Sequence, residues 1–179
     1  MYNFLYMLIV YMRMNRLSPM DALDFLPHPL VIVTAGDPDN PKRRGGMTAA
    51  WCSRVSWSPP LIMVSIAPSR YTLELIQETK EFAVNVVGES LEKAAYGVFG
   101  TMSGRYVDKF KESGVKMGRA RSIKAPIIED ATVVLECRLV KIVEAGDHFI
   151  VVGEVVDASR FKNEEPLVFL NGDSARVVK

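Results

Sequence analysis

Residues 47–67 read MTAAWCSRVSWSPPLIMVSIA, which places two runs of strand-forming residues, Met47–Trp57 and Leu61–Ala67, on either side of a proline pair. The prolines of the intervening Ser58-Pro59-Pro60 cannot donate hydrogen bonds to a strand ladder, so this segment predicts a hinge between two strands. A third run, Leu30–Thr34 (LVIVT), comes before them and is closed by turn-forming residues. We expect the three strands to pair as an antiparallel unit.

Three short helices are expected between the strands. Ser18 precedes Pro19 and Asp21, a pattern typical of a helix start, and predicts a helix that runs to about Phe25. A second helix is expected from a cap at Ser69 or Thr72 to near Lys80, and a third from Ser90 to about Phe99. Further strands are expected at residues 82–87, 131–143, 148–158 and 167–170.

The order of these elements predicts the fold class. At least six strands follow one another in mostly hairpin order, and the two long ones are joined across the turn EAGD at 144–147. Helices are inserted between strands and do not alternate with them as in a parallel layer fold. The sequence therefore predicts a mainly β protein with α insertions, an antiparallel barrel.

The amino-acid composition limits the kinds of binding partner to be expected. The 179 residues are 49% hydrophobic and 24% charged, as expected for one folded domain. With 22 basic and 21 acidic residues the net charge is +1, so nucleic acid is not expected as a partner, and any anion must be held by a few placed cations and backbone donors. Two cysteines without CxxC spacing and two histidines predict no metal site, and unpaired thiols suit the cytoplasm.

The first residues, MYNFLYMLIVYM at 1–12, are strongly apolar. They are too few to span a membrane, and the basic residues follow the run and do not precede it as in a signal peptide. Three interpretations stay open: an arm that packs on a partner subunit, residues added by an upstream start codon, and a weak membrane anchor. We expect residues 1–17 to form an N-terminal apolar arm or extension, residues 18–179 to form the domain, and no membrane partner.

Several common catalytic motifs are missing from the sequence. It contains no Walker A motif and no strand-associated G-x-G-x-x-G, so neither a P-loop nor a Rossmann nicotinamide site is expected. No G-x-S-x-G elbow is present to support a serine hydrolase.

Four sequence blocks appear in the order known from one family. They are GGMTAAW at 45–51 running to SWSPPL at 56–61, SRYTLELI at 69–76 leading to EFAVNV at 81–86, SGRYVDKF at 103–110, and GDH at 146–148 with GEV at 153–155. Over about residues 27–170 the chain resembles the flavin reductase-like family of FMN-binding split barrels. Each block is weak singly, but four in the right order are specific.

The resemblance implies a homodimeric, Greek-key-like split β-barrel that binds FMN, with NADH or NADPH as a diffusible co-substrate. It implies His148 as the catalytic residue that orients the substrate. The cofactor-binding residues that it implies are Met47, Thr48, Ala49, Ala50, Trp51, Ser65, Arg70, Thr72, Ser103, Arg105 and Lys109.

The chemistry of these residues agrees with a flavin mononucleotide. Small residues at 48–50 let backbone N–H groups approach the ring, and Arg70 with Thr72 at a helix start suits the phosphate. Each assignment has a structural alternative. The stretch at 48–51 is also compatible with a packed strand, and Arg70 with a solvated position at a capped helix start.

The block at 103–110 also has two interpretations. Ser103, Arg105 and Lys109 either close over the phosphate or receive the nicotinamide nucleotide, or else Asp108 pairs with Lys109 or Arg105 as a structural latch. His148 is equally an ordinary residue at a strand start.

Trp51 or Trp57 either shields the ring or packs in the core, Cys52 is expected to pack, and His28 is expected in a turn. The family commonly has Asn where Gly45 stands, and we hypothesise that Arg44 compensates by adding positive charge.

The function predicted is an NAD(P)H-dependent oxidoreductase that transfers hydride to flavin and onward to free flavin, ferric iron or a protein acceptor. The alternative is a non-catalytic, flavoredoxin-like FMN protein that carries electrons and is reduced by a partner. Space and groups for a nicotinamide distinguish the two, and Arg105, Lys109 and His148 are the candidate groups.

Overall fold

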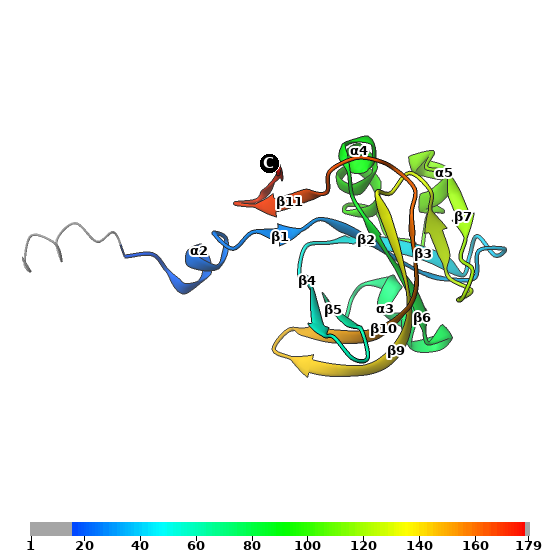
Figure 1. Cartoon of the computed structure of the whole chain (residues 1–179), viewed down its shortest axis with the longest axis horizontal. Helices are drawn as coiled ribbons and strands as arrows, with labels where there is room; N and C mark the ends of the chain where they lie inside the picture. Colours follow the sequence, from blue (N-terminus) through cyan, green and yellow to red (C-terminus); the bar gives the residue numbers. More distant parts are fainter. Residues whose placement is uncertain (1–15, 178–179) are drawn as a thin grey trace, which may run out of the picture.

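The computed structural model describes residues 16–177. Seven antiparallel strands form the main sheet in the order β3-β2-β6-β9-β10-β5-β4 (Figure 1). Their bounds are β2 Val31–Gly36, β3 Arg44–Ala49, β4 Cys52–Ser56, β5 Leu61–Ile66, β6 Glu81–Val86, β9 Val133–Ala145 and β10 His148–Arg160. The expected mainly β, antiparallel fold is confirmed.

The two edges of this sheet are consecutive in the chain. β3 pairs with β2 and β4 pairs with β5, and only Ala50 and Trp51 join β3 to β4. A sheet whose opposite edges are two residues apart must curl on itself, and because β3 and β4 do not pair, the barrel stays split along this line.

The expected single strand Met47–Trp57 is therefore wrong, because this stretch forms two strands, β3 and β4. The antiparallel pairing with the neighbouring strands is observed for β2 with β3 and for β4 with β5, but β3 and β4 do not pair with each other. The chain bends at Ala50, and the Cys52 amide donates to the Ala50 carbonyl at 2.8 Å, which closes a three-residue turn. The apolar pattern continues through this turn, so it does not reveal the break between the strands. The turn places residues 48–51 at the split.

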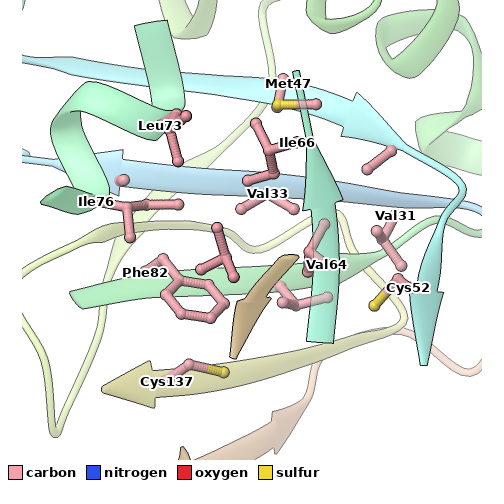
Figure 2. Close-up of a cluster of buried hydrophobic side chains, with 14 of the residues drawn as sticks. Val31, Val33, Met47, Cys52, Val64, Ile66, Leu73, Ile76, Phe82 and Cys137 are labelled. Atoms are coloured by element: carbon pink, nitrogen blue, oxygen red, sulfur yellow. The ribbon is translucent and has the colours of Figure 1, made fainter. Parts of the chain in front are cut away.

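Two hydrophobic clusters lie on the two faces of the sheet. The barrel interior packs Val33, Val64, Ile66 and Phe82 together with Cys137 (Figure 2). Phe82 requires Gly153 opposite it, because a Cβ there would lie 2.5 Å from the Phe82 ring. The second cluster packs the outer face of β2, β6 and β9 against the helical segments at 89–99 and 109–113. It is built from Leu30, Ile32, Ala83, Leu91, Phe99, Phe110, Ile128 and Val134.

The helices fall close to the expected places but differ in form. α2 (Pro19–Leu23) is capped by the Ser18 hydroxyl and ends before Phe25. α3 (Tyr71–Thr79) ends at Lys80, which adopts the left-handed conformation. The helix expected at 90–99 is a succession of η1 (Glu89–Leu91), α4 (Glu92–Ala94) and the π-helix η2 (Ala95–Phe99). α5 (Lys109–Ser113) follows.

Short strands complete the fold, and several were not expected. β1 (His28–Pro29), β11 (Leu167–Leu170) and β12 (Asp173–Arg176) form a small sheet, and β7 (Met117–Arg119) pairs with β8 (Pro126–Ile128). Of these only β11 follows from the sequence pattern, because runs of two to four residues carry too little periodicity. Figure 1 shows α2 and β1 extending away from the barrel.

The expected arm at 1–17 lies mostly outside the described residues. Within the described part, α2 buries none of its residues. No helix in the stretch from 16 to 177 is long and apolar enough to cross a membrane.

Candidate functional site

Two adjoining pockets open beside the split of the barrel and share Met47 and Arg70. The first, of about 120 Å³, is lined by Gly46, Met47, Ser69, Arg70, Tyr71, Thr72, Thr101, Met102, Ser103, Gly104 and Lys109. The second, a groove of about 260 Å³, is lined by Met47, Thr48, Ala49, Ala50, Trp51, Ser65, Ala67, Arg70, His148 and Phe169. Of the twelve site residues predicted from sequence, Arg105 alone is absent from both linings.

Lys109 gives the first pocket a buried positive charge. Its side chain is 3% exposed, and its Nζ donates to the Gly46 carbonyl at 2.8 Å and the Phe99 carbonyl at 3.0 Å. Burial, together with the charge of Arg70, lowers the pKa of Lys109 to about 8. The ion pairs found among residues 16–177 do not include Lys109. A buried cation without a carboxylate is costly, and an anion in the pocket removes that cost.

The start of α3 adds backbone donors to the same pocket. The expected side-chain cap at Ser69 or Thr72 is wrong, because Arg70 occupies the N-cap position and no side chain caps the helix. The Leu73 amide donates to the Arg70 carbonyl at 3.0 Å, whereas the amides of Tyr71 and Thr72 have no acceptor within the helix, and the helix dipole favours an anion there. Thr72 is 2% exposed and also lines the pocket.

The loop at 101–104 forms the opposite wall. A Cβ on Gly104 would lie 3.1 Å from the Tyr71 ring, so this close approach favours glycine. Sequence reasoning named Ser103 but missed Thr101, Met102 and Gly104. Nothing in the sequence pattern shows which residues of a loop face inward.

Arg105 points elsewhere. It forms an ion pair with Glu74 and lies over the Tyr71 ring at 5.1 Å. The expected latch is also different, because Asp108 pairs with Arg44 and not with Lys109 or Arg105.

The hypothesis that Arg44 adds charge to the site is not supported by its contacts. Its guanidinium is bound by Asp108 and by the Pro38 carbonyl at 2.6 Å. A Cβ at Gly45 would lie 3.3 Å from a Leu75 methyl and 3.5 Å from the Tyr71 ring, a tight but not prohibitive fit.

The groove is built from the β3–β4 turn, the end of β5 and the start of β10. Thr48 donates its hydroxyl to the Ala95 carbonyl at 2.6 Å, and the Ser65 amide donates to the Trp51 carbonyl at 2.9 Å. These bonds fix the short turn of small residues against its neighbours. The groove therefore offers backbone and small side chains to a flat ligand.

Aromatic side chains close the groove. The rings of Trp51 and His148 lie 5.0 Å apart, and Nδ1 of His148 lies 2.7 Å from an Asp147 carboxylate oxygen. The hydrogen bond to His148 lowers the pKa of Asp147. Phe169, on β11, was missed because it lies far from the other lining residues in sequence.

Trp57, Cys52 and His28 do not line either pocket. Trp57 is 80% exposed and stacks on Arg54. Cys52 packs in the barrel, where burial raises the pKa of its thiol to about 12. His28 lies in β1, opposite Phe169, so a turn at this position is not observed.

Together the two pockets suit an elongated ligand. One end offers a buried ammonium, a guanidinium and helix N–H groups, which match a phosphate, while the other offers a groove lined by backbone and aromatic rings, which matches a planar heterocycle. These residues fit a flavin mononucleotide.

The chain belongs to the flavin reductase like domain family, whose model matches residues 23–177. This finding confirms the family resemblance, the fold class and the expectation of a flavin reductase-type oxidoreductase.

Relatives from several organisms are 32–39% identical to this chain. The NADH-dependent FAD reductase of Streptomyces globisporus is 32% identical over 146 residues, 82% of this chain and 77% of that protein. The NADH:riboflavin 5′-phosphate oxidoreductase of Streptomyces pristinaespiralis is 34% identical over 137 residues, 76% and 73% of the two chains. An uncharacterized protein of Aeropyrum pernix is 39% identical over 139 residues, but the matched region spans only 51% of its length.

Solved structures agree in fold. The NADH:FAD oxidoreductase SgcE6 of Streptomyces globisporus superposes with a TM-score of 0.81 at 28% identity, covering 93% of this chain and 99% of that chain. The flavoredoxin of Methanosarcina acetivorans superposes with a TM-score of 0.79 at 25% identity, covering 93% and 92%.

Proposed function

We propose that this protein is an NAD(P)H-dependent flavin reductase that binds FMN in the two adjoining pockets. The observation that carries the proposal is the buried ammonium of Lys109, which has no carboxylate partner among the described ion pairs and lines the small pocket beside the groove. A phosphate monoester supplies the missing negative charge, and the ring system extends into the groove past Arg70. The NADH-dependent relatives support the same reaction class.

FMN is proposed in preference to FAD because of the form of the first pocket, which contains Lys109 and is called the anion pocket from here on. The pocket measures about 120 Å³ and is walled by the loop at 101–104 and the start of α3. A terminal phosphate fits such a space, whereas the phosphate of a larger dinucleotide must continue outward.

When bound, the flavin ring supplies the redox chemistry, accepting hydride from a reduced nicotinamide and passing electrons onward. The chain's own residues bind and orient. Lys109, Arg70 and the first turn of α3 hold the phosphate, and the backbone at 48–51 contacts the ring edge. Trp51 and His148 border the groove, so we assign His148 to orienting the nicotinamide. Hydride transfer needs no protein acid or base, and the contribution of the protein is orientation.

A non-catalytic FMN protein that carries electrons is the second candidate. Its support is the similarity to the flavoredoxin and to the high molecular weight rubredoxin of Moorella thermoacetica. The rubredoxin is 34% identical over 149 residues, which make up 83% of this chain and 62% of that protein. Such a protein shares every phosphate contact but is reduced by a partner. Free flavin, ferric iron and a protein are the acceptors proposed for either form.

We also propose a homodimer formed by the domain at 18–179. The α2 segment buries none of its residues, and Met20, Leu23, Phe25 and Leu26 are exposed on and after it. A second copy would cover this apolar surface. A cytoplasmic location is proposed because Cys52 and Cys137 are buried and unpaired.

The test is an anaerobic absorbance spectrum of the FMN-loaded protein before and after NADH, and separately NADPH. Bleaching of the flavin band by either donor without a partner protein is the expected result and ranks the donors. A bound flavin that stays oxidised with both supports the electron carrier, and failure to retain FMN overturns both candidates.

A further inference from the structure

The π-helical turn η2 (Ala95–Phe99) is the one stretch of its kind in the part of the chain that the structure describes. Its wide turn is closed by the Gly100 amide, which donates to the Ala95 carbonyl five residues earlier at 2.8 Å. Such turns replace regular α-helix only at some cost and are frequent at functional sites. This one packs against β3, whose residue Met47 lines both the groove and the anion pocket.

Two carbonyls of this turn bind side chains that line the two pockets. The Ala95 carbonyl accepts the Thr48 hydroxyl at 2.6 Å, and Thr48 lines the groove. The Phe99 carbonyl accepts Lys109 Nζ at 3.0 Å, and Lys109 lines the anion pocket. The same short segment therefore contacts one residue at each end of the site, one from β3 and one from α5.

We propose that the π-turn positions the flavin site, with Gly100 as a positioning residue that acts through the Ala95 carbonyl. This inference rests on the proposed function. In a regular α-helix each residue advances about 100° around the helix axis. Removing the extra residue of the π-turn would therefore change the direction of the Phe99 carbonyl relative to that of the Ala95 carbonyl. The wider turn presents both carbonyls to Thr48 and Lys109.

Two glycines of the segment provide a matched pair of variants. A Cβ at Gly100 would lie 3.0 Å from the Ala95 carbonyl oxygen and 3.3 Å from the Tyr96 carbonyl oxygen, so it must displace the acceptor of Thr48. A Cβ at Gly97 meets nothing within 4 Å. Both changes from glycine to alanine reduce the freedom of the unfolded chain in the same way. Only Gly100→Ala disturbs the carbonyl.

The experiment measures FMN affinity and thermal unfolding for the full-length wild type, Gly97→Ala and Gly100→Ala. We expect Gly100→Ala to weaken FMN about tenfold, the loss of one well-placed hydrogen bond. Gly97→Ala should match the wild type. Equal FMN affinity in the two variants would overturn the proposal.

A double-mutant cycle separates positioning from general destabilisation. Thr48→Val removes the hydroxyl that Ala95 accepts, so after it Gly100→Ala should have clearly less effect on FMN affinity than in the wild type. Fully additive losses would mean that Gly100 does not act through the Ala95–Thr48 bond.

Hydrogen exchange on the wild type provides a measurement that needs no variant. FMN binding should slow exchange of the Gly100 amide more than that of the Leu91 amide, which bonds Gly88 at the other end of the helical segment. Equal slowing at both amides would contradict the proposal. If the wild type binds no FMN, the proposed function itself fails, whereas normal wild-type binding with an unaffected Gly100→Ala removes this inference alone.

Discussion

The guanidinium of Arg44 binds the carboxylate of Asp108 through two hydrogen bonds, from Nε at 3.2 Å and from Nη2 at 2.6 Å. Arg44 begins β3, and Asp108 precedes the buried Lys109, so the pair ties the start of α5 to the edge strand of the barrel. Burial acts against the charge of Asp108, but the hydrogen bond and charge of Arg44 outweigh it and lower the pKa of Asp108. Both side chains are less than one-fifth exposed.

Asp108→Asn should therefore lower both stability and FMN affinity. Breaking one side of a largely buried pair leaves an uncompensated charge and costs about 3 kcal/mol, less any relief from solvent. Chemical denaturation measures the stability, and FMN titration measures the displacement of Lys109. Asp39→Asn, which removes the exposed partner of Arg119, is the matched control and should change stability by less than about 1 kcal/mol. Equal losses in the two variants would contradict this view.

Arg70→Ala should weaken FMN binding about 10- to 100-fold, the value of a charge-assisted hydrogen bond to phosphate. Riboflavin, which lacks the phosphate, should bind the wild type and Arg70→Ala with the same affinity. The measurement is therefore the ratio of FMN affinity to riboflavin affinity, each obtained by titration. Arg105→Ala is the control, since Arg105 pairs with Glu74 and lines neither pocket. An affinity ratio that falls equally in both variants would remove Arg70 from the phosphate site.

FMN affinity should fall as pH rises above about 8, because deprotonation of Lys109 removes the charge that the phosphate needs. Above this pKa the protonated fraction falls about tenfold per pH unit. Titrations between pH 7 and 9.5 measure the effect, with riboflavin correcting for the ring. Lys109→Met should bind FMN weakly and with no such pH dependence. A wild-type affinity that is flat over this range would contradict the assignment.

The same pKa predicts the stability of the ligand-free protein. The pKa of Lys109 lies below its ordinary value of 10.5, so between about pH 8 and 10.5 the unfolded chain binds a proton that the folded chain has released. Stability due to this residue should therefore increase as pH rises through that window and be lowest below pH 8. The difference in unfolding free energy between wild type and Lys109→Met, followed with pH, measures it. A constant difference would be inconsistent with a depressed pKa.

His148→Ala should slow reduction by NADH or NADPH more than it weakens FMN binding. Its ring borders the groove beside Trp51 and not the anion pocket. Rapid-mixing reduction of the FMN-loaded variant at saturating flavin separates the two effects. Asp147→Asn should have a smaller effect, since that carboxylate is largely exposed. If FMN loss accounts for the whole effect of His148→Ala, the nicotinamide role is wrong.

The chain's local patterns predicted most strands of the main sheet and the places of the helices, but they joined β3 and β4 into one expected strand. The site residues came from the four ordered blocks and the family resemblance that they carry, and eleven of the twelve residues line the two pockets.

Tertiary packing decided the rest. The split between β3 and β4 depends on the bend at Ala50 and on long-range pairing that places the two strands at opposite edges of one sheet, and Phe169 reaches the groove through the small sheet with β1. Long-range pairing also chose Glu74 for Arg105 and Arg44 for Asp108. It left Lys109 with two carbonyls in place of a carboxylate. Charge type is encoded residue by residue, but which charges become partners depends on the folded distances between them, and those distances left one lysine among the basic residues buried beside a pocket without a carboxylate.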